Sequence, residues 1–182
     1  MAGAKALVKG VLKKCFNIGP EGVDDYRRRG VKIGENVNMY SCNIDYGHGF
    51  LIEIGDNCTI THTTILTHDA STKMYLGYSK VGRVKIGNNV FIGQGSIILP
   101  GVCIGNDVII GAGSVVKKDI PDRTVAAGNP AEPICSLDKY IERNKERMES
   151  APRYEKHWSD KTPEDIRRMQ EELSDGKTGY DL

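Results

Sequence analysis

The sequence lacks the features of a membrane-spanning, secreted or nucleic-acid-binding protein. Its 25 Lys and Arg and 24 Asp and Glu almost cancel, so the net charge of +1 provides no global attraction to nucleic acid or an anionic surface. No apolar run reaches the roughly 18 residues of a membrane-spanning helix. The N-terminus has no apolar block followed by a small-residue cleavage site. We therefore expect a cytoplasmic protein with no transmembrane segment and no nucleic-acid partner.

The sequence lacks paired cysteines. The five cysteines are an odd number, and no two of them make a Cys-x-x-Cys motif. A disulfide framework or a zinc ribbon would need such pairing. The cysteines therefore favour a reduced compartment.

Charge is distributed unevenly along the chain. Residues 1–32 carry eight basic and three acidic side chains, residues 86–116 carry only Asp107, and residues 135–182 carry 22 charged side chains. A nearly uncharged stretch is buried or belongs to a repetitive structure. We therefore divide the chain into an N-terminal segment (1–32), a central domain (33–134) and a C-terminal tail (135–182).

Both ends of the chain contain helix candidates. Ala4–Phe16 is typical of a short basic helix, which could contact an anionic lipid surface weakly (residues 4–16) or cap the central domain. In the tail, helices are expected at 136–149 and 163–174. The second follows Thr162-Pro163, a capping hydroxyl and then a proline at the first helical position.

The central domain is rich in glycine and follows a six-residue repeat. Fourteen of the 21 glycines lie between residues 31 and 130. The repeating aliphatic positions are Ile86, Ile92, Ile98, Ile104, Ile110 and Val116, and upstream Ile54, Ile60 and Leu66. Small or β-branched residues stand two positions before many of them: Cys58, Thr64, Val90, Ser96, Val102, Val108 and Ser114.

Strand geometry explains a period of six. Successive side chains alternate faces, so the aliphatic residue and the small residue two positions earlier point the same way. An inward pair followed by a sharp turn makes one side of a prism, and three sides make a coil of about 18 residues. Residues such as Gly87-Asn88-Asn89 tolerate the positive φ of the turns. In this phase Cys58 points inward as a space filler and Cys103 faces outward. An ordinary β-sandwich would alternate with a period of two and space its turns more widely.

The repeat runs through residues 82–134, GRVKIGNNVFIGQGSIILPGVCIGNDVIIGAGSVVKKDIPDRTVAAGNPAEPI. This stretch resembles the hexapeptide-repeat acyltransferases, and among them the galactoside, maltose and capsular-polysaccharide O-acetyltransferases. The resemblance covers about residues 30–135. It implies an all-β fold with helical appendages, a left-handed parallel β-helix, which is an exception to the usual right-handed crossover. It also implies a homotrimer with active sites between neighbouring subunits.

A loop interrupts the repeat, and His68 stands at its root. Leu66 and Ile86 are 20 residues apart where 18 would keep the phase, so residues 67–85 should leave the prism. Loops on rigid scaffolds often carry function, and a neutral imidazole can accept a hydroxyl proton. The resemblance implies that His68 is the base for direct attack of a sugar hydroxyl on the acetyl-CoA thioester, without an acyl-enzyme. A solvated loop histidine is the alternative.

The acceptor side of the site is expected near the root of this loop. An imidazole base needs a partner on its second nitrogen, and Asp45, close to one coil earlier, could reach the level of His68. The resemblance makes Asp45 and His48 candidate contacts to the sugar or to the base, with plain turn residues as the alternative. Asp69 is also a candidate, although neighbours in an extended segment point apart, and Tyr75 could stack on a sugar ring or pack against the protein.

The donor side is expected on the last coils. The resemblance implies that Gln94 and Ala112 contact CoA and that Lys117 and Lys118 match a threonine–lysine pair of the galactoside enzymes, although a solvated basic turn is the alternative. Those enzymes carry two arginines after the AGNPA motif. Here Glu132 and Cys135 stand at those positions. Substitutes for the arginines at the CoA 3′-phosphate are Lys118, Arg123 and Lys139.

A zinc site is not expected. His48, His62 and His68 suggest the three-histidine set of the gamma-type carbonic anhydrases, but His62 and His68 are six residues apart, on successive sides of the prism. We therefore expect acetyl-CoA as the donor and no metal.

The sequence thus predicts an acetyl-CoA-dependent sugar O-acetyltransferase of capsular or other polysaccharide biosynthesis. Three alternatives remain open. They are an N-acetyltransferase that acts on an amino-sugar nucleotide, a serine or streptogramin acetyltransferase, and a non-catalytic β-helix scaffold.

Overall fold

A computed structural model describes residues 22–182. The helix expected at Ala4–Phe16, and the lipid contact expected of residues 4–16, lie outside the described residues. The chain forms two compact units, divided between Leu137 and Asp138. Within residues 22–182, no helix is both long and apolar enough to cross a membrane.

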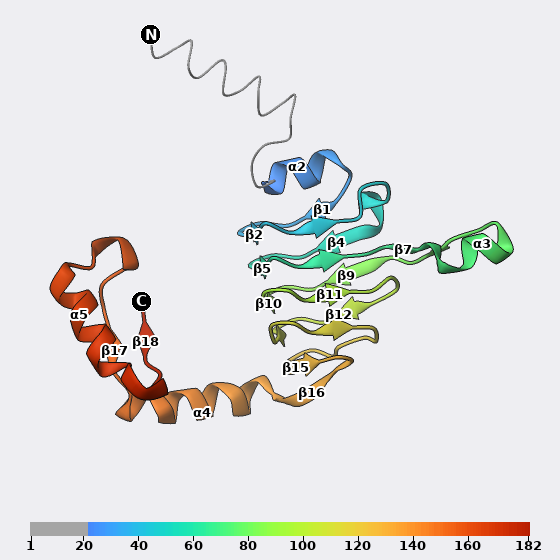
Figure 1. Cartoon of the computed structure of the whole chain (residues 1–182). Coiled ribbons are helices and arrows are strands. Elements are labelled where there is room, and N and C mark those ends of the chain that lie inside the picture. The colour runs from blue at the N-terminus through green and yellow to red at the C-terminus, as the bar shows by residue number, and fades with distance from the viewer. Residues whose placement is uncertain (1–21) are drawn as a thin grey trace, which may run out of the picture. The chain divides into compact units, whose positions relative to one another are not determined.

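The first unit is built from three sheets that form the sides of a prism (Figure 1). Face A contains β1 (Lys32–Ile33), β4 (Ile52–Ile54), β9 (Val84–Ile86) and β12 (Cys103–Ile104). Face B contains β2 (Asn38–Tyr40), β5 (Thr59–Thr61), β10 (Phe91–Ile92), β13 (Ile109–Ile110), β15 (Thr124–Gly128) and β16 (Ala131–Ser136). Face C contains β3 (Asn43–Ile44), β6 (Thr64–Ile65), β11 (Ile97–Ile98) and β14 (Val115–Val116).

The chain visits faces A, B and C in turn, which defines four coils. Coil 1 is β1–β3, coil 2 is β4–β6, coil 3 is β9–β11 and coil 4 is β12–β14. Every strand pairing between these coils is parallel, and only the terminal β15–β16 pair on these faces is antiparallel. The fold is a left-handed parallel β-helix, which confirms the expectation from the repeat and the resemblance.

The aliphatic residues of the repeat fill the interior of the prism. On face B, for example, Ile60, Ile92 and Ile110 are in register and none of them is exposed. Burial of each such side chain contributes about 1.5–3 kcal/mol to folding. Cys58 is buried and Cys103 is exposed, as the phase of the repeat predicted.

Coil 2 departs from the predicted phase. Ile65 and Thr63 are buried, whereas Leu66 and Thr64, predicted to point inward, are only half-buried. The corner between faces B and C is the reason, because four residues separate the inward Ile60 and Ile65 where five separate the corresponding isoleucines of coil 3. The prediction of Leu66 as an inward residue was therefore wrong.

The corner between faces A and B carries a ladder of polar side chains. In this corner ladder, each carboxylate or amide Oδ1 accepts from a backbone N–H of the preceding coil. The bonds are Glu35 N to Asp56 (2.7 Å), Asp56 N to Asn88 (2.8 Å), Asn88 N to Asn106 (2.9 Å) and Asn106 N to Asp122 (2.7 Å). Such bonds satisfy backbone donors that the sharp turn leaves without strand partners.

Glycine in this corner is required by close approach. The left-handed φ values belong to Asn36, Asn57, Asn89 and Asp107, at 55–56°. A Cβ on Gly87 would lie 2.6 Å from the carbonyl oxygen of Gly105. Of the Gly, Asn and Asp residues expected to tolerate the positive φ of the turns, the asparagine and aspartate residues adopt it at this corner.

Two segments that flank coils 1 and 2 position the site: a helix before coil 1 and a loop after coil 2. Helix α2 (Val23–Arg28) covers the first coil in Figure 1, and its fully buried Tyr26 donates to the carbonyl of Cys42 at 2.7 Å. Between coils 2 and 3 the chain leaves the prism as a loop. This loop contains β7 (His68–Asp69), the 3₁₀ helix η2 (Ala70–Thr72), α3 (Lys73–Leu76) and β8 (Lys80–Val81). Strands β7 and β8 are antiparallel. Figure 1 shows α3 at the end that projects from the stack.

The second unit contains the tail helices. These are α4 (Leu137–Ser150), which begins at the boundary, and α5 (Pro163–Glu172), with η3 (Trp158–Asp160), η4 (Ser174–Gly176) and the parallel pair β17 (Arg153–Tyr154) and β18 (Tyr180–Asp181). The Thr162 hydroxyl caps α5 by accepting from Asp165 N, as its sequence predicted. Among residues 138–182 only Tyr154 is buried.

Candidate functional site

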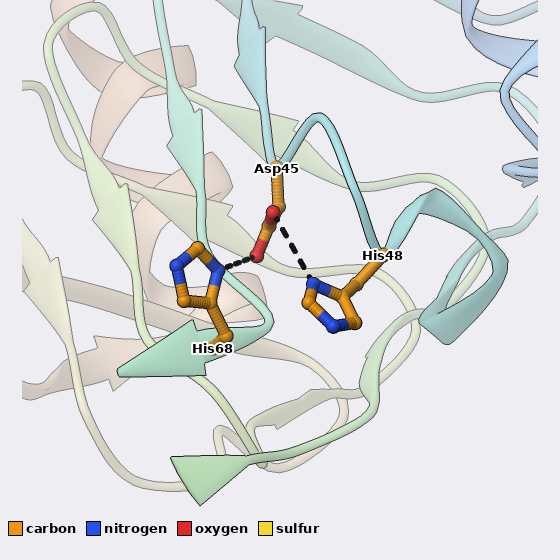
Figure 2. Close-up of side chains that lie close together, drawn as sticks. All are labelled: Asp45, His48 and His68. Atoms are coloured by element: carbon orange, nitrogen blue, oxygen red, sulfur yellow. Dashed lines mark hydrogen bonds and ion pairs between the residues drawn. The ribbon is translucent and has the colours of Figure 1, made fainter. Parts of the chain in front are cut away.

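Asp45 and His68 meet at the corner between faces C and A. Asp45 directly follows β3, and its N–H donates to the carbonyl of Ile65 at 3.0 Å, which places it above the end of β6. His68 leaves the same corner at the start of β7. Asp45 Oδ2 lies 2.5 Å from His68 Nδ1 (Figure 2). The parallel register of coils 1 and 2 therefore brings together two residues that are 23 positions apart.

Asp45 is ionised, and its Oδ2 is the acceptor for donors from His68 and Thr67. Its side chain is only 2% exposed, and Thr67 donates to Oδ2 from its backbone N–H (3.2 Å) and from its hydroxyl (2.8 Å). Burial acts to raise the pKa of Asp45, but hydrogen bonds from His68 and Thr67 outweigh burial and hold that pKa well below its usual range. Because ionised Asp45 accepts at Nδ1 of His68, the ring carries its proton there. Nε2 of His68 keeps its lone pair, on a side chain that is 40% exposed.

His48 lies on the other side of the same carboxylate. It stands in the connection between β3 and β4, just before η1 (Gly49–Leu51). Its Nδ1 is buried, has no hydrogen-bond partner among the described residues, and lies 3.6 Å from Asp45 Oδ1 (Figure 2). The rings of His48 and His68 are 5.3 Å apart at their centroids. The structure therefore brings Asp45, His48 and His68 into one cluster.

Close packing at Gly49 holds the His48 connection in place. A Cβ on Gly49 would lie 2.6 Å from the carbonyl oxygen of Arg29, at the end of α2. The cap of the prism thus supports the position of His48. Nothing in the sequence signals this contact between residues 20 positions apart.

Asp69 and Tyr75 belong to the loop and are not part of this cluster. Asp69 accepts from Ser71 N at 2.8 Å and pairs with Lys80 at 3.1 Å. The bond from Ser71, together with Lys80, lowers the pKa of Asp69 to about 2. Tyr75 lies on α3, with 82% of its side chain exposed. Asp69 therefore braces the loop, and Tyr75 stands at its projecting end.

The expected donor-side residues occupy two different corners. Gln94 and Ala112 lie on successive coils at the corner between faces B and C, where Gly113 N donates to the carbonyl of Gln94 at 2.8 Å. Lys117 and Lys118 follow β14 at the corner between faces C and A, the corner of His68. With about 3.3 Å per residue, the five residues of one side separate the two corners by about 16 Å. Within one chain the structure brings Gln94 to Ala112, but neither of them to His68.

In the structure, the two positions where the galactoside enzymes carry arginines hold no cationic side chain. Glu132 lies on β16 and its carboxylate is 3.6 Å from Lys118 Nζ. Cys135 is half-buried on the same strand. Lys118 therefore already has one anionic neighbour, and both groups are largely exposed.

Sequence reasoning missed Thr67 and the aromatic residues beside His48. Thr67 is fully buried and supplies two of the donors to Asp45. Tyr46 is 80% exposed, with the guanidinium of Arg29 at 4.7 Å from its ring centre, and Phe50 is 60% exposed. Their positions depend on the long connection between β3 and β4, whose length was visible in the sequence but whose path was not.

The cluster can be compared with a metal site. One ligand atom from each of Asp45, His48 and His68 lies within 4.8 Å of the others, a donor set that divalent transition metals accept. Two ligands of one tetrahedral zinc stand about 3.3 Å apart, given bond lengths near 2.0–2.1 Å. The 2.5 Å between Asp45 and His68 is a hydrogen-bonding distance, so the geometry fits an Asp–His dyad. His62 lies at another corner and does not join this cluster.

Three comparisons place the chain among known proteins. The sequence profile of the bacterial transferase hexapeptide family (six repeats) matches residues 83–118. CapG of Staphylococcus aureus is 48% identical over an alignment of 124 residues, and the match covers 64% of this chain and 72% of CapG. Other curated relatives are matched over about half of their own length.

Two solved structures share the fold, and the match covers more of their length than it does for those curated relatives. Galactoside acetyltransferase in complex with coenzyme A is 29% identical, with a TM-score of 0.52 over 77% of this chain and 84% of that one. The hexapeptide-repeat acetyltransferase VCA0836 of Vibrio cholerae O1 biovar eltor, complexed with acetyl coenzyme A, is 25% identical. Its TM-score is 0.54, over 70% of this chain and 84% of that one.

Proposed function

The chain belongs to the hexapeptide-repeat acetyltransferase family, and on that premise we propose that it transfers acetyl from acetyl-CoA to a sugar hydroxyl in polysaccharide biosynthesis. The observation that carries the proposal is the Asp45–His68 dyad at the root of the extruded loop. Acetyl-CoA as donor is supported by the coenzyme complexes of two related structures, and a sugar acceptor by the name of one of them.

His68 acts as the general base. Nε2 takes the proton of the acceptor hydroxyl as the oxygen adds to the thioester carbonyl carbon. The tetrahedral intermediate collapses, the carbon–sulfur bond breaks, and the CoA thiolate takes the proton from His68. Asp45 keeps His68 in the tautomer that leaves Nε2 free and stabilises the imidazolium that forms.

No covalent acetyl-enzyme is needed in this route. Burial raises the pKa of the Cys42 and Cys58 thiols, which keeps both as poor nucleophiles. Cys103 is exposed, but its strand β12 belongs to coil 4, two coils beyond the strand that leads to His68. A single proton shuttle at His68 is therefore sufficient.

The donor site lies between two copies of the chain. Lys117 and Lys118 share a corner with His68, whereas Gln94 and Ala112 lie one prism side away, so one acetyl-CoA meets both groups only if they come from neighbouring copies. The strand residues of faces B and C in coils 1–4 include no charged side chain, whereas face A presents Lys32, Glu53 and Lys85. Uncharged faces are the ones that associate at lowest desolvation cost. The assembly we propose is a homotrimer.

The acceptor sugar lies at the level of coils 1 and 2. His48 faces it from the cluster around Asp45, and Asp69 and Tyr75 are placed to contact it, or its copy in a neighbouring site, from the loop. Lys117 and Lys118 lie two coils further along the axis, toward the nucleotide end of CoA. The acceptor and the donor nucleotide therefore occupy opposite ends of the groove.

The test measures thiol release from acetyl-CoA against a panel of sugars, amino sugars and serine. The wild-type protein should turn over with a sugar acceptor, and His68→Ala should lower turnover at least about 100-fold, because a positioned base contributes this much. His157→Ala, a change to an exposed histidine of the second unit, is the matched control and should keep full activity. A His68→Ala protein that keeps most of its activity contradicts the proposed base. Turnover with amino sugars or serine alone contradicts the acceptor.

A further inference from the structure

His62 has a backbone conformation that disfavours side chains. It closes the corner between faces B and C in coil 2, with φ of 44°, and its side chain is exposed. At the same corner, coils 3 and 4 place Gly95 (φ 77°) and Gly113 (φ 70°). Gly95 N donates to the carbonyl of His62 at 3.2 Å, so the positions stack directly. An imidazole is kept where the next two coils use glycine, and strain of this kind concentrates at functional sites.

The short corner of coil 2 makes the imidazole prominent. This corner has one residue fewer than the corners of coils 3 and 4, so its backbone projects less from the prism. The side chain of His62 is exposed at this corner. Nothing in the packing of the interior requires it, because Thr63 and not His62 points inward.

His62 extends the line of the expected donor contacts. Ala112, Gln94 and His62 lie on coils 4, 3 and 2 at one corner, at intervals of about 4.8 Å. His62 and His68 flank the same strand, β6, so they stand at one level on adjacent corners. If the pantetheine arm runs past Ala112 and Gln94, its thioester arrives at the level of His62 of that copy and His68 of the next.

We propose that His62 of one copy donates a hydrogen bond to the thioester carbonyl oxygen of acetyl-CoA, facing His68 of the neighbouring copy. This inference rests on the proposed function and on the groove between copies. As the acceptor oxygen adds to the carbonyl carbon, the carbonyl electron pair moves to that oxygen, and the imidazole N–H of His62 stabilises the resulting anion. When the carbon–sulfur bond breaks, the carbonyl re-forms and CoA leaves with the proton held by His68. His62 therefore gains and loses no proton overall.

The first test replaces His62 by glycine. Glycine stands at this corner in coils 3 and 4 and adopts positive φ without strain, so the corner and the assembly should be kept. Turnover should fall about 100-fold, the usual effect of removing one oxyanion donor, with little change in KM for acetyl-CoA. Ser41→Gly is the matched control, since Ser41 closes the same corner one coil earlier with φ of 50°. It should keep wild-type turnover.

The second test asks whether His62 and His68 act from different copies. His62→Gly and His68→Ala chains carrying different tags are co-expressed, and the mixed assemblies are purified through both tags. In a trimeric ring where each site takes His62 from one copy and His68 from the next, every mixed trimer has both residues intact in about a third of its sites. The purified mixed assemblies should therefore recover about a third of wild-type turnover, whereas each parent alone stays low.

Three results overturn the inference. They are full turnover by His62→Gly, no recovery in the mixture, and an equal loss in Ser41→Gly. Circular dichroism and gel filtration check that His62→Gly keeps its fold and assembly. If it does not, His62→Asn is used instead, because asparagine tolerates the same φ. This variant should lose less turnover than the loss expected for His62→Gly. Full activity of His62→Asn also counts against the proposal. If turnover needs His68 but not His62, this inference is wrong and the proposed function stands. If the wild-type protein shows no turnover, the proposed function is wrong.

Discussion

At the scale of single residues, the site depends on one carboxylate shared by several donors. Asp45 accepts from the ring of His68 and twice from Thr67, and His48 stands 3.6 Å away. A buried carboxylate with this many donors stays ionised and holds its partners in fixed orientations. The position of His68 and of Asp45 could be predicted from the sequence because the loop interrupts the repeat and Asp45 lies near one coil upstream. Thr67 could not, because nothing in the sequence indicates that its hydroxyl points toward Asp45.

Replacement of Asp45 by asparagine tests this arrangement. Asp45→Asn should lower turnover at least about 100-fold, because a neutral amide does not hold His68 in the required tautomer. Because the pKa of Asp45 is lowered in the folded protein, its contribution to stability is complete above about pH 4 and is lost as the pH falls below that value. The difference in melting temperature between wild type and Asp45→Asn should therefore be larger at pH 7 than at pH 3, measured by circular dichroism. A difference that is constant with pH would show that Asp45 does not titrate as described.

At the scale of the elements, the period of six determines which residues face inward, and the corners determine where the phase shifts. The inward isoleucines of coils 3 and 4 follow the repeat without exception. In coil 2, both Ile65 and Leu66 are aliphatic, so the sequence allows either phase and only the shorter corner decides between them. For the donor residues the same period places Gln94 and Lys117 on different corners, because they are 23 residues apart in coils of about 18.

The close approach of the coils at the corner between faces A and B predicts a strong effect of Gly87→Ala. The added Cβ would lie 2.6 Å from a backbone carbonyl oxygen, and backbone there has no room to shift without breaking the corner ladder. We expect a loss of about 2 kcal/mol in the free energy of unfolding, from urea denaturation. Gly47→Ala is the control, since its Cβ meets nothing within 4 Å. Equal stability of the two variants would contradict the close-packing explanation.

At the scale of the whole molecule, the two units differ in how they are stabilised. The first unit has a continuous interior of aliphatic side chains, whereas residues 138–182 bury only Tyr154. Ion pairs such as Lys161–Asp181 (2.7 Å) and Lys156–Asp165 (2.6 Å) link the elements of the second unit in place of an apolar core. A unit of 45 residues with so small a core has little stability of its own.

Truncation after Leu137 tests this difference. The shortened chain should keep the β-helix and unfold cooperatively, because its core is contained in the first unit. Residues 138–182 produced alone should lack stable structure by circular dichroism. A shortened chain that aggregates or melts without cooperativity would show that the β-helix needs the tail.

The corner ladder has a direction, and this direction has a consequence for synthesis on the ribosome. Each backbone N–H in the ladder finds its acceptor in the coil that follows, 16–32 residues later in the chain. At about 5–20 residues per second, a nascent coil waits about one to six seconds before its corner is satisfied. The coils therefore complete their corner hydrogen bonds in order from the N-terminal coil beside α2. The most recently made coil always lacks its acceptor, and every earlier coil has one. The nascent β-helix exposes one unfinished edge at a time, whatever the number of coils.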